Sequence, residues 1–326
     1  MYLERERAVA IEAVTEACCL CRNVQNRIAG PLTVAKLDAS PVTVADFGSQ
    51  ALIISRLRTI FPNDTIIGEE EASLLRREDQ QPLKNEVVSL VQLFETDLTE
   101  EMILNAIDYG ARSGDFRQRY WTLDPIDGTK GFLRGDQYAV ALALVEDGQP
   151  VLGVLGCPNL PEDDKHSGRG KGMLFIAVKD RGAVMRPLNG GCEQIAHVDS
   201  VTDPSNARFC DSVEAAHVAH DQHAKIAGIL GISTPAYHID SQCKYAVVAG
   251  GDASIYLRLT PPGYYSCIWD HAAGVAVIRE AGGNVTDVYG RTLDFSLGRR
   301  LFKNVGVVAT NGHLHAAVIA AVQQIL

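Results

Sequence analysis

The sequence lacks an excess of positive charge and any long apolar run. Its 326 residues carry 30 Lys and Arg against 40 Asp and Glu, which gives a formal net charge of −10. This balance argues against a nucleic-acid backbone or an anionic membrane as the main partner. No apolar stretch approaches the roughly 18 residues of a membrane span, and the charged start Met1–Arg7 does not resemble a signal peptide. We therefore expect an intracellular, cytoplasmic protein.

Cysteine is present but scattered. Cys18, Cys19 and Cys21 crowd one predicted helix, yet no nearby His or Cys completes a zinc site, so the eight cysteines fit reduced core thiols. A length of 326 residues with 46% hydrophobic content is enough for about two domains. We place the boundary after residue 188, with an N-terminal metal-binding α+β part (1–188) and a C-terminal α/β part (189–326).

Hydrophobic spacing predicts alternating helices and strands. A period of about 3.6 marks helices over Ala8–Cys21 and Phe47–Phe61, and a turn-rich segment, 30–41, lies between them. Alternating apolar residues predict a hairpin of Gln137–Val145 with Pro150–Cys157. A second series follows residue 189, including helices over 221–230, 242–249 and 313–326 and a strand over 254–259. This order predicts a layered α/β or α+β fold.

One short stretch, Leu123–Phe132, concentrates the candidate chemistry. The aromatic and β-branched segment Arg119–Leu123 reads as a strand, which we expect Pro125 to end, so that Asp124 and Asp127 leave the sheet edge together. Gly128 allows a tight turn, and Thr129 adds a hydroxyl. Such a group suits a hard cation and a water molecule, although an Asx-rich turn after a strand would look the same.

Other carboxylates also stand at the ends of predicted elements. Asp46 begins the second helix, Glu69 and Glu70 follow the apolar run 65–68, and Asp270 begins a later helix. Each alone could be a helix-start acid or a solvated loop residue. If all six carboxylates converged without cations, their repulsion would oppose folding or raise their pKa values. Convergence would therefore indicate bound metal.

Three motifs in this order are similar to those of one family. Gly68-Glu69-Glu70, Asp124-Pro125-Ile126-Asp127-Gly128-Thr129 and Trp269-Asp270-His271-Ala272-Ala273-Gly274 resemble the signatures of the metal-dependent, lithium-sensitive phosphatases related to inositol monophosphatase. Over nearly the whole chain, further stretches resemble the 3′(2′),5′-bisphosphate nucleotidase branch. These stretches are 40–46, 128–135, 156–159 and 240–245.

The resemblance implies a layered α/β/α/β/α sandwich and a phosphomonoesterase. Its substrate would be adenosine 3′,5′-bisphosphate, converted to AMP, or the 3′-phospho sulfate donor of sulfate assimilation. The metal ligands would be Glu69, Asp124, the carbonyl of Ile126, Asp127 and Asp270, holding about two or three Mg²⁺ ions. Asp46 and Thr129 would orient and activate the attacking water. The substrate would contact Thr129, His217, Ser241, Lys244 and Arg258. We also expect a monomer.

Departures from the family pattern leave alternatives open. Ala215-Ala216 precede His217 where relatives carry a Gly, and Tyr265-Ser266-Cys267 replace a Glu-Lys pair, so an inositol phosphate phosphatase remains an alternative. A covalent route like that of haloacid dehalogenases would need a single residue between its two acids, whereas two residues, Pro125 and Ile126, separate them here. A non-catalytic binding protein has no reason to keep six repelling carboxylates. The basic, glycine-rich stretch 165–172 lacks P-loop spacing and is interpreted as a hairpin loop.

Overall fold

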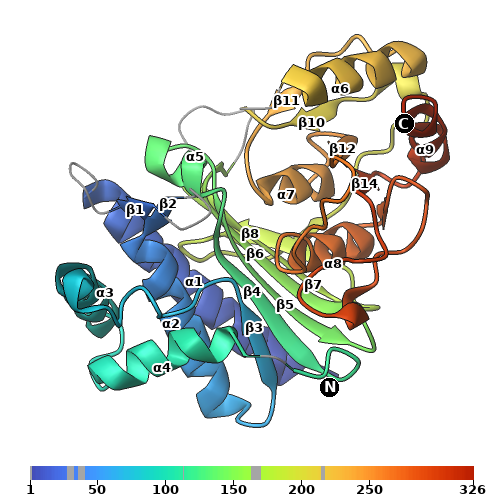
Figure 1. Cartoon of the computed structure of the whole chain (residues 1–326). Coiled ribbons are helices and arrows are strands. Elements are labelled where there is room, and N and C mark those ends of the chain that lie inside the picture. The colour runs from blue at the N-terminus through green and yellow to red at the C-terminus, as the bar shows by residue number, and fades with distance from the viewer. Residues whose placement is uncertain (1, 28–32, 36–40, 113, 163–169, 214–216) are drawn as a thin grey trace.

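The chain folds into five layers that alternate between helices and sheets (Figure 1). The computed structural model describes residues 2–27, 33–35, 41–112, 114–162, 170–213 and 217–326. One hydrophobic cluster lies between the first helices and the larger sheet, a second between the two sheets, and a third under the last helices. This order is the α/β/α/β/α sandwich that the family resemblance implies.

The larger sheet has seven strands in the described part of the chain. Its order is β3-β4-β5-β6-β7-β8-β9, and all neighbours are antiparallel except β3 and β4. The central strands are almost wholly buried on both faces because helices cover both sides. The bounds are β3 Thr65–Gly68, β4 Tyr120–Asp127, β5 Ala139–Glu146, β6 Gln149–Pro161, β7 Lys171–Val178, β8 Ala183–Pro187 and β9 Gln194–Ala196.

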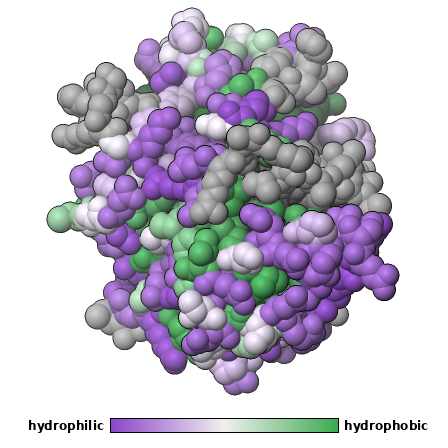
Figure 2. Space-filling view, turned by 90° about the vertical axis from the view of Figure 1, so that its left-hand side faces the viewer, coloured by the Kyte–Doolittle hydropathy of each residue, from purple (hydrophilic) through white to green (hydrophobic). Residues whose placement is uncertain are grey.

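Four helices form the first layer. The helices α1 and α2 pack on each other and on the sheet, and α3 and α4 pack against α2 (Figure 1). Thr99 caps α4, as its hydroxyl accepts from the N–H of Met102 at 3.3 Å. Seen from this side, the surface is largely hydrophilic, with apolar residues gathered towards its middle (Figure 2). The bounds are α1 Glu4–Arg27, α2 Val44–Ile60, α3 Gln81–Gln92 and α4 Glu100–Gly110.

The smaller sheet and the remaining helices complete the sandwich. Its order is β11-β10-β12-β14-β13, in which β10 is parallel to both of its neighbours. The helices α7 and α8 lie between the two sheets, and α6 and α9 cover the outer face (Figure 1). The bounds are α5 Thr129–Arg134, β10 Phe209–Asp211, α6 His217–Leu230, β11 Tyr237–His238, α7 Cys243–Ala249, β12 Ile255–Arg258, α8 Ala272–Glu280, β13 Asn284–Thr286, β14 Val307–Thr310 and α9 His315–Gln323.

The structure corrects three predictions. Pro125 does not end its strand: β4 runs on to Asp127, with a register shift between Asp124 and Asp127 at which a residue without an N–H loses no ladder bond. Asp270 lies two residues before α8 rather than in it. The expected turn-rich segment, 30–41, contains the short strand β1 Thr33–Ala35, which pairs with β2 Pro41–Thr43 at the end of the segment.

Two other predictions fall where the structure is silent or does not decide. The rest of the turn-rich segment and most of the loop 165–172 lie outside the described residues. The domain boundary after residue 188 stays a prediction, although the larger sheet takes its last strand, β9, from beyond it. No helix of the described chain has the length and apolar character that crossing a membrane requires.

Candidate active site

The end of β4 shapes the acidic loop. The N–H of Ile126 donates to Asp124 Oδ1 at 3.1 Å, and the hydroxyl of Thr129 donates to the carbonyl of Ile126 at 3.3 Å. Gly128 then adopts φ +88°, and a Cβ there would stand 2.7 Å from the Cβ of Ser241. Glycine therefore meets two demands at once, a left-handed turn and a close approach of the second half of the chain. The turn leads directly into α5.

The Glu69 loop reaches the same sheet edge because β3 and β4 are parallel. Gly68 is the register partner of Leu123, so Glu69 and Asp124 follow at corresponding positions. The buried amide of Gln50 fixes this loop: it accepts from the N–H of Glu70 at 3.0 Å and donates to the carbonyl of Glu70 at 2.6 Å. Both contacts are to main-chain groups, so they set the path of the loop.

Asp46 and Asp270 come to Asp124 from different halves of the chain. Asp46 lies in the first turn of α2 and is buried. Asp270 precedes α8 on the C-terminal side, where its Oδ2 accepts from Arg258 Nη2 at 3.2 Å. The site therefore draws on elements from both halves of the chain.

The carboxylates are close enough to disturb one another. Burial raises the pKa of Asp124 well above its ordinary value, and the charges of Glu69, Asp127, Asp270 and Asp46 raise it further. Burial and the charge of Asp270 raise the pKa of Asp127 to about 6, against the opposing effect of Lys244, Arg258 and the N–H of Gln242. Burial also raises the pKa of Asp270, and Arg258 opposes this shift. The cluster thus has the electrostatic signature of a cation site.

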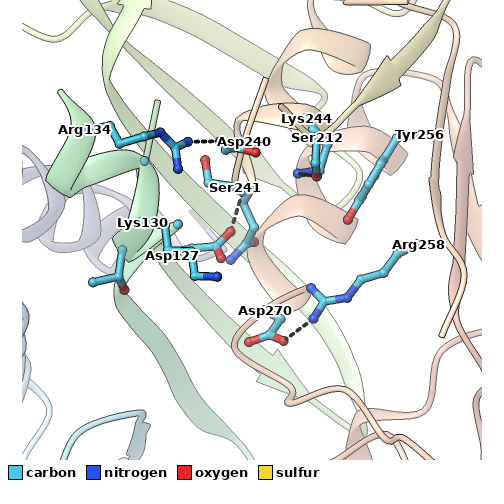
Figure 3. A pocket seen from close by; sticks show the side chains of 14 residues that line it. Asp127, Lys130, Arg134, Ser212, Asp240, Ser241, Lys244, Tyr256, Arg258 and Asp270 are labelled. Carbon is cyan, nitrogen blue, oxygen red and sulfur yellow. Dashed lines mark hydrogen bonds and ion pairs between the residues drawn. The ribbon is translucent and has the colours of Figure 1, made fainter. Parts of the chain in front are cut away.

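A cleft of about 320 Å³ opens beside these acids. Asp127 and Asp270 lie on its floor, and basic groups face them from β12 and α7 (Figure 3). Lys244 is buried; its Nζ donates to Ser212 Oγ at 3.1 Å and lies 5.4 Å from the ring centre of Tyr256. Burial lowers the pKa of Lys244. This side of the cleft is suited to an anionic group of a substrate, since it pairs cations with hydroxyls.

The donor set fits magnesium in the chemistry of its oxygen atoms. Among the described residues, no group of three or more His, Cys, Asp or Glu side chains is arranged to hold a metal ion as it stands. Two of the acids have partners of their own, because Asp270 binds Arg258 and Asp127 accepts from the N–H of Gln242. The predicted ligands offer only carboxylate and carbonyl oxygen. Mg²⁺ prefers such oxygen ligands, and the set lacks the His and Cys side chains that are typical of zinc sites.

The structure gathers most of the predicted site residues. Thr129, Asp127, Asp270, Ser241, Lys244 and Arg258 line the cleft. The charges of Asp46 and Glu69 act on Asp124, which lies next to the cleft in β4. His217 is the first residue of α6, and its side chain is outside the described part of the structure.

Sequence reasoning missed several residues that line the cleft. Four of them lie inside the stretches that resemble the family, and sequence reasoning assigned them no role: Lys130, Arg134, Asp240 and Gln242. Ser212 and Tyr256 gave no such signal, because each reaches the cleft only through the pairing of β10 with β12.

Comparison with known proteins places this arrangement in a family. A model of the inositol monophosphatase family matches residues 3–326. The chain belongs to the inositol monophosphatase family. Members of this family are generally metal-dependent. The suppressor protein suhB of Bartonella henselae, a solved structure, shares the fold with a TM-score of 0.67 at 20% identity, over 98% of this chain and 98% of that one.

Closer relatives within the inositol monophosphatase family carry a more specific name. The chain is 47% identical to a 3′(2′),5′-bisphosphate nucleotidase of Emericella nidulans over 100% of this chain and 99% of that protein. It is 41% identical to a protein of the same name from Dictyostelium discoideum over 99% and 97% of the two chains. These similarities extend over the whole length and therefore include both sides of the cleft.

Proposed function

We propose that the protein is a Mg²⁺-dependent 3′(2′),5′-bisphosphate nucleotidase. It removes the 3′-phosphate of adenosine 3′,5′-bisphosphate to leave AMP, and acts in the same way on 3′-phosphoadenylyl sulfate. The observation that carries the proposal is the cleft, in which an acidic floor faces Lys244 and Arg258, within a chain that resembles named nucleotidases over its full length. A substrate with two phosphates needs both sides of such a cleft.

The acids on the floor of the cleft and beside it would hold about two or three Mg²⁺ ions. Glu69, Asp124, Asp127, Asp270 and the main-chain carbonyl of Ile126 are the proposed ligands. When bound, such ions lower the pKa of water and neutralise charge on a phosphoryl group that is being displaced in line. The ions would also release the mutual repulsion that raises the pKa values of Asp124 and Asp127.

The chain's own groups would position the reactants. Asp46 is buried in the first turn of α2, which packs on β4, and Thr129 begins α5, which follows β4, so we assign both to orienting a water molecule beside the end of β4. In the structure the hydroxyl of Thr129 donates to the carbonyl of Ile126, which leaves its oxygen as an acceptor for that water. Ser241, Lys244 and Arg258, with His217 at the start of α6, would hold the nucleotide.

The geometry disfavours a phosphorylated aspartate. Asp124 is only 3% exposed and sits inside β4, and its Oδ1 already accepts from the N–H of Ile126. A nucleophile needs access to the phosphorus atom, so direct attack by water fits the position of Asp124 better. A phosphoenzyme trapped on Asp124 would contradict this mechanism.

The first test is phosphate release with three substrates. Adenosine 3′,5′-bisphosphate, inositol 1-phosphate and inositol 1,4-bisphosphate are each assayed with Mg²⁺, with chelator and with added Li⁺. We expect rapid Mg²⁺-dependent release from the nucleotide, inhibited by Li⁺ and abolished in Asp127→Ala. Preference for the inositol substrates would keep the metal mechanism and refute the nucleotide assignment. Release from none of them would refute the enzymatic function.

A further inference from the structure

A three-residue segment, 240–242, joins the two sides of the cleft. On the side of α5, Asp240 Oδ2 accepts from Arg134 at 2.6 Å; on the side of β10, its Oδ1 accepts from the N–H of Val213 at 3.0 Å. The next residue, Ser241, has φ +66°, a conformation that non-glycine residues rarely adopt. Its Oγ accepts from the N–H of Cys243 at 3.2 Å, which supports the turn. The segment is therefore held in one conformation from several directions.

The last residue of the segment, Gln242, contacts Asp127 and also the turn that carries Asp270. Its main-chain N–H donates to Asp127 Oδ2. Its side-chain Nε2 donates to the carbonyl of Trp269, the residue before Asp270, at 2.9 Å. Its Oε1 accepts from the N–H of Gly274 at 3.3 Å. One residue thus binds a carboxylate through its backbone and fixes the turn of a second carboxylate through its side chain.

The side chain of Gln242 also satisfies the start of α8. The residue that precedes this helix, His271, makes no capping hydrogen bond, and Gly274 has one of the first N–H groups, which lack a partner inside the helix. Gln242 is only 1% exposed, so water cannot replace its amide. Loss of the amide would leave the Trp269 carbonyl and the Gly274 N–H without this partner in a buried place. The turn that carries Asp270 would then be free to shift.

We propose that Gln242 is a positioning residue that sets the separation of Asp127 and Asp270 for cation binding. The inference rests on the proposed function, because it assumes that both carboxylates share the bound ions. Residues that orient metal ligands through hydrogen bonds typically change metal affinity or activity on the order of 10–100-fold when replaced. Both amide atoms of the Gln242 side chain contact main-chain groups, so its replacement should act on the metal and on turnover rather than on nucleotide affinity.

The test compares two glutamines whose side-chain amides each donate to a main-chain carbonyl and accept from a second partner. Gln242→Met keeps the approximate length of the side chain and removes both amide contacts. Gln149→Met is the matched control: the amide of Gln149 donates to the carbonyl of Leu293 at 3.2 Å and accepts from Arg279 at 2.8 Å, so it also joins the two halves, but outside the cleft. Mn²⁺ affinity is measured by electron paramagnetic resonance without substrate. KM, kcat and the Mg²⁺ requirement are measured with adenosine 3′,5′-bisphosphate.

Each outcome decides the proposal. We expect Gln242→Met to weaken Mn²⁺ binding and lower kcat about tenfold or more, with the nucleotide KM at saturating Mg²⁺ unchanged and Gln149→Met like the wild type. Equal Mn²⁺ affinity in all three proteins would refute the positioning role while leaving the nucleotidase intact. A wild type that neither binds Mn²⁺ nor releases phosphate would refute the proposed function itself. If Gln242→Met does not fold, Gln242→Asn takes its place, because its amide is one methylene too short for both contacts. It must then show weaker Mn²⁺ binding and a lower kcat with an unchanged nucleotide KM.

Discussion

Replacing Asp127 with Asn should stabilise the metal-free protein while it destroys the activity. The pKa of Asp127 rises from 3.8 to about 6 on folding, so ionised Asp127 opposes the folded state. At about 1.4 kcal/mol per pH unit, this rise corresponds to about 3 kcal/mol at neutral pH. Asn has the same shape, and its Oδ1 can still accept from the N–H of Gln242. The variant should therefore recover most of that free energy of unfolding.

The size of this effect depends on pH in a defined window. When folding raises the pKa of a carboxyl, the folded protein loses stability as pH rises from the unfolded-state pKa to the folded-state pKa. The difference between Asp127→Asn and wild type should be absent below about pH 4. It should grow up to about pH 6 and stay constant above, up to neutral pH.

Urea unfolding in the presence of a chelator measures this difference, and added Mg²⁺ reverses it. A ligand at 100 times its Kd stabilises the folded state by about 2.7 kcal/mol, and only the wild type should gain this much. Asp97→Asn, a change of the same charge at an exposed position, is the control and should leave both quantities unaltered. An Asp127→Asn protein that is less stable than wild type in chelator, or that gains equally from Mg²⁺, would refute the view of these carboxylates as a repelling cation site.

Three further predictions concern the packing and the cleft. Gly274→Ala would place a Cβ 2.3 Å from ring atoms of Tyr245 and should destabilise the protein by about 1–3 kcal/mol in urea, whereas Gly228→Ala, with open space around it, should not. Lys244→Met should raise the KM for adenosine 3′,5′-bisphosphate about 10–100-fold, since a charged hydrogen bond is lost; an unchanged KM would contradict its role. Burial lowers the pKa of His315, whose ring nitrogens bond to Thr286 and Thr310, so stability should fall as pH drops below 6.5, and less so in His315→Gln; identical pH profiles would contradict this.

The sequence predicts the fold better than it predicts the local backbone. Strong apolar periodicity marked the central strands and helices, and the three motifs located the acidic residues. The continuation of β4 past Pro125 was not predictable, because a proline can either end a strand or occupy a bulge, and only the pairing with β5 decides between them.

The contacts around the cleft depend on tertiary structure in the same way. Gln242 and Asp240 stood in a recognised stretch, but their roles come from partners such as Trp269 and Arg134 that lie far away in the sequence. Ser212 and Tyr256 reach the cleft through strand pairing alone. Local pattern therefore predicted many of the residues that line the cleft and could not predict the contacts that hold them in place.

The distribution of the acids along the chain has a consequence for synthesis. Asp46, Glu69, Asp124 and Asp127 emerge from the ribosome well before Asp270 and before Arg258, which lowers the pKa of Asp127 and Asp270. Domains generally fold from the N-terminus during translation. The nascent larger sheet would therefore carry an acidic edge without its basic neighbours, and its native compaction should await the arrival of the C-terminal strands.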